Sequence, residues 1–293
     1  LNMIARYAYT YDGVGNRLER YGVDKNNTYT YDAIYRLLGS ITTSPSNQQE
    51  AKREVFTYDP VGNRLTSYPG RVYTYNAGNE LVKFKDKVYT YDNNGNLAIK
   101  TEEDSDEDVE IEGWTYSYDY ENRLVKAVKR EKDELKTVTF KYDPFGRRME
   151  KRVESVDKGI SETRTYGYVY DNEDIIIEYI TWGEAGQSWT ETIRYTHGLG
   201  IDEPLTMEKG GLLYYFHADG LGSITALSDG QGDAVQRYEY DSFGKPIDKS
   251  KTIKQPYAFT GRGRSVSFLF CWMLMLVKII PLSKEREQRN KQI

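Results

Sequence analysis

The chain has 293 residues, of which 40 are basic and 45 are acidic, and it carries a formal net charge of -5. This length is sufficient to bury a hydrophobic core, whereas the mixture of charges disfavours nucleic-acid binding. The single cysteine, Cys271, excludes an internal disulfide and a zinc site built from thiolates. Tyrosine occurs 27 times against nine phenylalanines, and it prefers pleated, half-buried surfaces. The composition therefore predicts a β-protein.

The chain begins without a secretory signal pattern, and aromatic residues alternate almost from its first residue. Leu1 to Arg6 lack a basic-then-apolar stretch, from which we expect a fragment of a longer protein. Tyr7, Tyr9 and Tyr11 follow with a spacing of two, as aromatic residues also do further along the chain. A spacing of two places all these rings on one face of a strand and polar side chains on the other. The pattern predicts half-buried β-strands.

A Tyr-Asp pair recurs along the chain and indicates a structural repeat. The pairs begin at residues 11, 31, 58, 91, 118, 142, 170 and 240, and Tyr75-Asn76 is an imperfect ninth copy. The spacing suits two short strands and a connection in each unit. We therefore expect repeated antiparallel hairpins.

Most copies continue as Asp-x-x-Gly, which is typical of a type I turn. Aspartate at the first position bonds backbone amides two residues on, and glycine at the fourth accepts a left-handed conformation. The residues to which we assign this structural role, together with a related block near the C-terminus, are Tyr11, Asp12, Gly15, Tyr58, Asp59, Gly62, Tyr91, Asp92, Gly95, Tyr142, Asp143, Gly146, His217, Asp219, Gly222, Tyr240, Asp241 and Gly244.

The repeated aspartates admit two other interpretations, which are less favoured. Glycosidase chemistry needs two carboxylates that converge on one sugar, not one in every turn. The run Asp92 to Asn96 is similar to a calcium loop, but its glycine stands fourth where that loop needs it sixth. The sequence thus predicts no catalytic residue, no metal site and no cofactor.

Several segments depart from the repeat. Residues 102–112 carry eight carboxylates and no cation, which predicts an exposed loop. Ile175 to Ile177 predicts a buried strand, and nothing indicates a long helix before residue 262.

A denser pattern occupies residues 194–262 and includes a His-x-Asp-x-Leu-Gly-Ser block from His217 to Ser223. His217, Asp219 and Ser223 are the residue types of a nucleophilic triad. However, no Gly-x-Ser-x-Gly elbow surrounds Ser223, so a structural role is favoured. His197 is likewise expected to be a packed or turn histidine and not a metal ligand.

The repeated Tyr-Asp-x-x-Gly-Asn-Arg-Leu unit, joined to this block, resembles the Rhs/YD-repeat family over roughly residues 7–262. Relatives in that family include the C component of insecticidal toxin complexes and the YD shell of teneurins. The resemblance implies a long, spiralling β-sheet that forms part of a hollow shell and encloses a C-terminal toxin or effector segment. It also implies a secreted or cell-surface location, with the toxin segment or the remaining YD repeats as partners.

The family pattern stops at Arg262. Relatives continue into a tyrosine-rich stretch associated with self-cleavage, whereas this chain continues into an apolar run, 266–277, and a charged end. Twelve residues of helix span about 18 Å, and a bilayer core needs about 30 Å, so we expect no membrane span. We predict a YD-repeat region at 1–193, a truncated core-like region at 194–262 and an atypical, frame-shifted tail at 263–293.

The favoured function is a non-enzymatic shell fragment that encapsulates and helps to deliver a toxin or effector segment. An adhesin that binds cell-surface glycans is the alternative, because exposed tyrosines stack well on sugar rings. A hydrolase that depends on His217 and Asp219 is the weaker alternative.

Overall fold

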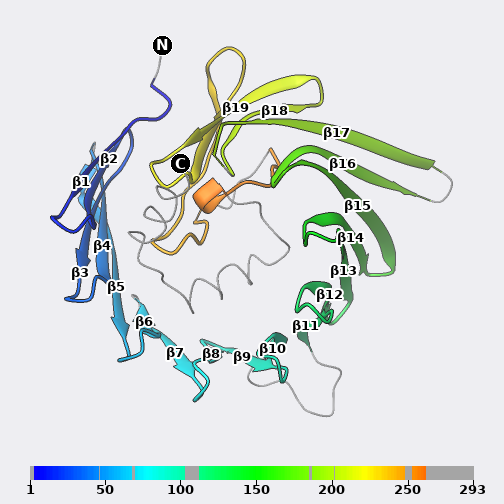
Figure 1. Ribbon diagram of the computed structural model, residues 1–293, viewed down its shortest axis with the longest axis horizontal. Helices are drawn as coiled ribbons and strands as arrows, with labels where there is room; N and C mark the ends of the chain where they lie inside the picture. Colours follow the sequence, from blue (N-terminus) through cyan, green and yellow to red (C-terminus); the bar gives the residue numbers. More distant parts are fainter. Residues whose placement is uncertain are drawn as a thin grey trace. The chain divides into compact units, whose positions relative to one another are not determined.

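The computed structural model confirms the predicted all-β fold (Figure 1). It describes residues 3–45, 47–67, 70–102, 112–184, 187–200, 202–247 and 253–261. Their regular structure consists of 21 β-strands and one short 3-10 turn. Within these residues, no helix is long and apolar enough to cross a membrane.

The chain divides into two compact units, and the first combines residues 1–79 with residues 217–293. Its elements are β1 (Tyr7–Tyr11), β2 (Arg17–Gly22), β3 (Asn26–Tyr31), β4 (Leu37–Ser44), β5 (Asn47–Tyr58), β6 (Arg64–Ser67), β7 (Arg71–Tyr75), β20 (Ile224–Ser228), β21 (Ala234–Arg237) and the 3-10 turn η1 (Phe259–Gly261).

The second unit comprises residues 80–216. Its strands are β8 (Leu81–Phe84), β9 (Lys87–Tyr91), β10 (Leu97–Glu102), β11 (Gly113–Tyr118), β12 (Leu124–Glu131), β13 (Glu134–Tyr142), β14 (Arg148–Asp157), β15 (Ile160–Asp171), β16 (Asp174–Glu184), β17 (Gln187–His197), β18 (Pro204–Lys209) and most of β19 (Leu212–Ala218). The division of the chain predicted at residues 193 and 262 stays a prediction.

Within each unit, consecutive strands pair antiparallel, as hairpins joined edge to edge. In the first unit the ladders run from β1 to β7, and β20 pairs with β21. In the second unit they run from β8 to β19, and Figure 1 shows β11 to β17 following one another in this order. Short connections between neighbouring strands make this the simplest arrangement for a chain of hairpins.

Burial alternates along the strands with the period of two that the sequence predicts. On β13, Val138 and Phe140 are buried, at 0% and 6% exposed. The side chain of Lys141, the next residue, is 72% exposed. One face of the strand therefore packs and the other is solvated.

The Asp-x-x-Gly segments form tight turns that the aspartate carboxylate holds together. In the first turn, Asp12 Oδ1 accepts hydrogen bonds from the backbone amides of Val14 and Asn16, at 3.1 and 2.8 Å. Its Oδ2 accepts one from the side-chain amide of Asn16, at 2.8 Å. The fourth residue, Gly15, has a φ of 93°. The predicted hydrogen bond from the amide two residues after the aspartate is confirmed. The two hydrogen bonds from the fourth residue after it, Asn16, were not predicted.

The same turn forms where glycine is absent. Tyr35, Asn79 and Asn122 occupy the fourth position in their copies, and their φ angles are 68°, 61° and 59°. Asn tolerates this region, whereas a tyrosine there is strained. A further copy, Asp229 to Gly232, has no tyrosine before it. Conversely, Asp171 follows a tyrosine but pairs with Asp174 across a shorter hairpin end.

Except at Tyr11, the tyrosine of each Tyr-Asp pair joins its hairpin to a preceding one, and so does Tyr75 of the imperfect copy. A register shift of the bulge type lies at this tyrosine in several hairpins, as between Lys141 and Tyr142, so that Tyr142 pairs with Arg148. Its hydroxyl donates to the carbonyl of Leu124, the first residue of the return strand one repeat earlier, at 2.8 Å. Eight tyrosines make this contact at 2.7–3.1 Å: Tyr31, Tyr58, Tyr75, Tyr91, Tyr118, Tyr142, Tyr170 and Tyr240.

Some expectations fall on other parts of the chain. Residues 103–111 of the acidic segment and the tail after residue 261 lie outside the described residues. Ile175 to Ile177 do lie in a strand, β16, but they are only half-buried, and its buried side chain is that of Glu178, 6% exposed.

The two glycines of the first turn give a matched test of its backbone. Gly15→Ala should lower the free energy of unfolding by about 1 kcal/mol, because a Cβ is strained at positive φ. A Cβ at either Gly13 or Gly15 meets nothing within 4 Å, and of the two only Gly15 has a positive φ. Gly13→Ala should therefore stay within about 0.5 kcal/mol of the unsubstituted chain in chemical denaturation. Gly62→Val and Gly146→Val should behave like Gly15→Ala, since both glycines have positive φ and open surroundings.

The tyrosine contacts can be tested by removing one hydroxyl. Tyr58→Phe should cost about 1 kcal/mol of stability, because Tyr58 donates to the Leu37 carbonyl at 2.7 Å. Burial raises the pKa of Tyr58 from 10.0 to about 12. This contribution is therefore complete below about pH 10 and is lost as the pH rises through about 12. Tyr120→Phe is the control, since Tyr120 is 89% exposed; an equal loss in both variants would contradict the role of the hydroxyl contact.

Candidate functional site

The His-x-Asp-x-Leu-Gly-Ser block lies in the first unit, where β19 ends and β20 begins. His217 belongs to the end of β19, Asp219 opens the turn, and Ser223 immediately precedes β20. The turn is a further copy of the aspartate turn, with Gly222 at a φ of 81°. The three residues that the sequence suggested as a triad therefore lie close together in the chain, at and beside the short connection from β19 to β20.

The three triad candidates do not form a proton relay. The His217 Nε2 atom lies 2.9 Å from the hydroxyl of Ser228, not of Ser223. The Ser223 hydroxyl instead accepts a hydrogen bond from the Thr260 amide at 3.1 Å, and Ser223 is 1% exposed. Burial, followed by the nearby charge of Arg237, lowers the pKa of His217. The imidazole is therefore neutral at pH 7, and it bonds a serine that is itself 3% exposed.

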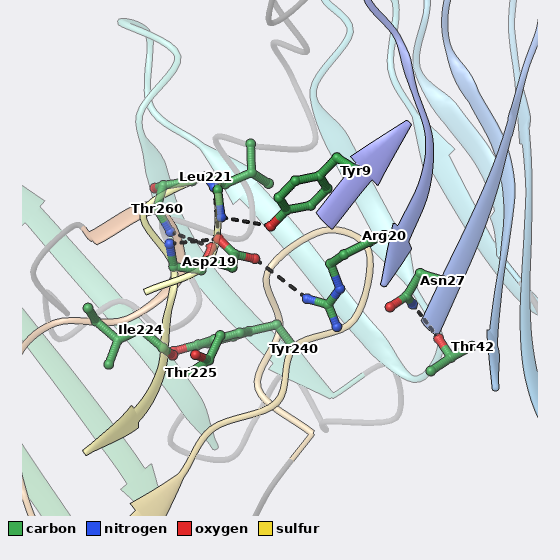
Figure 2. Close-up of polar contacts among 12 residues, drawn as sticks. Tyr9, Arg20, Asn27, Thr42, Asp219, Leu221, Ile224, Thr225, Tyr240 and Thr260 are labelled. Carbon is green, nitrogen blue, oxygen red and sulfur yellow. Dashed lines mark hydrogen bonds and ion pairs between the residues drawn. The ribbon is translucent and has the colours of Figure 1, made fainter. Parts of the chain in front are cut away.

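The carboxylate of Asp219 holds its turn and contacts the first hairpin. Its Oδ1 accepts hydrogen bonds from the amides of Leu221 and Ser223, at 2.9 and 3.0 Å. Its Oδ2 lies 3.6 Å from Arg20 Nη1 on β2, as Figure 2 shows. In the first turn the corresponding oxygen accepts from the side chain of Asn16, but here the fourth residue is Ser223. The second oxygen is thus available to an arginine distant in sequence.

Tyr9, on β1, makes the second contact of this junction. Its hydroxyl accepts a hydrogen bond from the Gly220 amide at 2.7 Å (Figure 2). The guanidinium of Arg17 lies over the Tyr9 ring, 4.1 Å from its centroid. A Cβ on Gly220 would lie 2.7 Å from the ring, so this close approach requires glycine. Burial raises the pKa of Tyr9, which keeps its hydroxyl protonated.

A later aspartate turn, from Asp241 to Gly244, docks on β4 and β5. Glu54 Oε2 accepts hydrogen bonds from the amide and hydroxyl of Ser242, at 3.1 and 2.6 Å. Phe243 meets the ring of Phe56 edge-on at 4.8 Å, and the Arg64 guanidinium stacks over Phe243 at 4.0 Å. Burial, followed by the charge of Glu54, raises the pKa of Asp241. Hydrogen bonds to a carboxylate, an aromatic contact and a cation-π contact therefore hold this turn against β4 to β6, and Ser242 and Glu54 are 188 residues apart in sequence.

These contacts define the candidate site as a structural junction between residues 217–261 and strands β1 to β5. Sequence reasoning identified Asp219 and Asp241 but missed Tyr9, Arg20 and Glu54, since no motif signals a contact across such a separation. His197 ends β17 in the second unit, and burial lowers its pKa. In the described parts of the chain, no three His, Cys, Asp or Glu residues gather as metal ligands would.

Comparisons with known proteins find one matching family model and several similar proteins and solved structures. The model of the Teneurin YD-shell family matches residues 6–262. The tRNA3(Ser)-specific nuclease WapA of Bacillus spizizenii is 29% identical over 150 residues, which cover 50% of this chain and 6% of that protein. The double-stranded DNA deaminase toxin A of Burkholderia cenocepacia is 24% identical over 272 residues, 87% of this chain and 18% of that protein. The crystal structure of TcdB2-TccC3-Cdc42 matches at 17% identity and a TM-score of 0.44, over 89% of this chain and 17% of that chain.

Two turn aspartates of the first unit should respond oppositely to loss of charge. At Asp12, desolvation acts to raise the pKa, but the hydrogen bonds from Asn16 and Val14 outweigh it and lower the pKa. Asp12→Asn should therefore destabilise the unit at pH 7, and this cost should vanish as the pH falls below the unfolded value of 3.8.

Asp241 has a raised pKa, so its stability contribution is complete below pH 3.8 and is lost as the pH rises through the folded value. Asp241→Asn keeps an oxygen for the amides of Phe243 and Lys245 and removes a buried charge. Its denaturation midpoint at pH 7 should equal or exceed that of the unsubstituted chain. Equal destabilisation of both variants at pH 7 would refute this assignment.

Proposed function

Because this chain belongs to the Teneurin YD-shell family, we propose that it forms part of the wall of a β-shell that encloses a C-terminal toxin or effector segment outside the cytoplasm. The observation that carries the proposal is the repeated tyrosine contact between hairpins, which allows the sheet to grow by one unit at a time. A wall of this kind acts by containment and needs no reaction centre of its own.

The names of the matched relatives support a toxin context for this wall. One is named a tRNA nuclease and the other a double-stranded DNA deaminase toxin. The chain spans only 6% and 18% of the lengths of these proteins, so their named activities describe much longer polypeptides. We assign such an activity to the enclosed segment and not to the hairpins. The remaining YD repeats of the complete protein would then be the neighbours of this wall.

The geometry of the block favours the non-enzymatic role over the hydrolase alternative. The carboxylate of Asp219 is engaged by its turn and by Arg20. The hydroxyl of Ser223 is buried and bonded to the backbone. Asp219 and Ser223 therefore stabilise the junction. The glycan-binding alternative has no such observation in its favour and stays a prediction.

Enclosure can be tested by limited proteolysis of the complete protein that carries this chain. Gly220→Val should push Tyr9 away from the block and open the junction, since even a Cβ added at this position would lie 2.7 Å from the ring. The effector segment should then become digestible, whereas it should stay protected in the unsubstituted protein.

Gly230→Val is the matched control, because a Cβ at Gly230 meets nothing within 4 Å and its φ is also outside the positive region. We expect this variant to protect the effector segment like the unsubstituted protein. If the segment is digested equally fast in all three proteins, the enclosure proposal is wrong.

A further inference from the structure

Two cations lie on an aromatic surface of the second unit that the shell function does not use. On neighbouring strands, Lys151 of β14 is directly opposite Phe140 of β13 and Tyr166 of β15. The Lys151 ammonium lies 4.2 Å from the centroid of the Tyr166 ring. The guanidinium of Arg148 lies 5.0 Å from the Tyr168 ring and 5.9 Å from the Phe140 ring. Both cations therefore share one row of rings.

Neither cation is compensated by an acceptor. Among the described residues, Lys151 and Arg148 take part in no ion pair and their side chains make no hydrogen bond, and the Arg148 Nε atom is buried. Both side chains are half-buried, so a small solute can reach them. Cations withdrawn from water without a partner are costly, and a bound anion would offset this cost.

The carboxylate of Glu178, which interacts electrostatically with both cations, does not supply that acceptor. Glu178 of β16 is opposite Tyr168, is 6% exposed and accepts a hydrogen bond from the Tyr195 hydroxyl at 3.0 Å. Burial raises the pKa of Glu178, which favours its uncharged form. Burial, and then the charge of Arg148, lowers the pKa of Lys151 to about 8.

The other charged groups around the cluster do not change this balance. Lys136 of β13 adds a further positive charge near Lys151. Lys209 of β18, which acts on Glu178, has its own partner in Glu191 at 3.6 Å. Burial also raises the pKa of Tyr166 and of Tyr168, so both rings stay neutral. The cluster is thus positive in total.

We propose that Arg148 and Lys151 form a binding site for an oxyanion of the phosphate or carboxylate class. The planar guanidinium offers several N–H donors to such a group, and the ammonium adds a point charge beside it. The bound oxyanion accepts hydrogen bonds from the guanidinium and the ammonium and neutralises the two cations. This site lies within β13 to β16 and is independent of the proposed shell function.

Competitive acetylation of the full chain tests the site directly. The chain is treated with limiting acetic anhydride in sodium phosphate, in sodium acetate and in sodium chloride at equal ionic strength, and each lysine is quantified by peptide mass spectrometry. Phosphate or acetate should slow acetylation of Lys151 severalfold relative to chloride. Lys141 should be unaffected, because its side chain is 72% exposed and pairs with Glu150 at 2.8 Å.

Substitution of the arginine separates binding from general screening. Arg148→Met should abolish the protection of Lys151 by the oxyanion. Arg152→Met should retain it, since Arg152 pairs with Glu154 at 2.8 Å on the opposite face of the same strand. Equal protection of Lys141, equal protection by chloride, or full protection in Arg148→Met would each overturn the proposal.

A stability measurement covers the case in which Arg148→Met fails to fold. Lys151→Met should be no less stable than the unsubstituted chain in chloride, because it removes an unpaired charge. The thermal midpoint of the unsubstituted chain should rise in the effective oxyanion, and that of Lys151→Met should not. A rise of equal size in both proteins would contradict the site.

Discussion

The hydrogen bond from a tyrosine hydroxyl to the backbone carbonyl of the previous hairpin is the contact on which the arrangement of the repeats depends. Strand pairing alone leaves the spacing of successive hairpins open, because a ladder of backbone bonds is compatible with several registers. The bond from Tyr142 to Leu124 removes this freedom, since it joins the bulge of one hairpin to the first return-strand residue of another. Burial keeps such hydroxyls protonated, as at Tyr58, and so keeps them donors.

Much of this fold can be predicted from local sequence, because its signals are local. A spacing of two marks the strands, and Asp-x-x-Gly marks the turns. The destination of each tyrosine hydroxyl cannot be predicted in this way, since its acceptor is a backbone carbonyl, which every residue has. The turn at Asp229 shows that a preceding tyrosine is not required for the turn, and Asp171 shows that a Tyr-Asp pair does not guarantee one. The aspartate turn and the tyrosine before it are therefore independent features that usually occur together.

The candidate site shows how one residue changes the use of a repeated carboxylate. The fourth residue after the aspartate supplies a side-chain donor in the turns of Asp12 and Asp32, through Asn16 and Arg36. Ser223 occupies this position after Asp219, and the free oxygen faces Arg20 instead. A local turn motif thus becomes a long-range contact. The three residue types that suggest a catalytic triad in the sequence have separate structural roles here. Asp219 caps its turn, Ser223 accepts a backbone hydrogen bond, and His217 contacts another serine, Ser228.

The alternation of apolar and polar residues does not predict which buried strand positions carry polar side chains. These side chains have individual structural roles. Glu178 and Arg64 occupy positions that the alternation reserves for apolar side chains, and they are 6% and 3% exposed. Arg64 is stabilised there by its stack on Phe243 and by a hydrogen bond to Tyr73, so its burial serves the junction. Arg148 follows its own turn as Arg64 does, and the Nε atoms of both are buried without an acceptor, but no side-chain hydrogen bond of Arg148 matches the one that Arg64 donates to Tyr73. The two arginines stand on comparable aromatic surfaces, so the difference lies in their hydrogen-bond acceptors: Arg64 has the Tyr73 hydroxyl, and for Arg148 we propose a bound oxyanion.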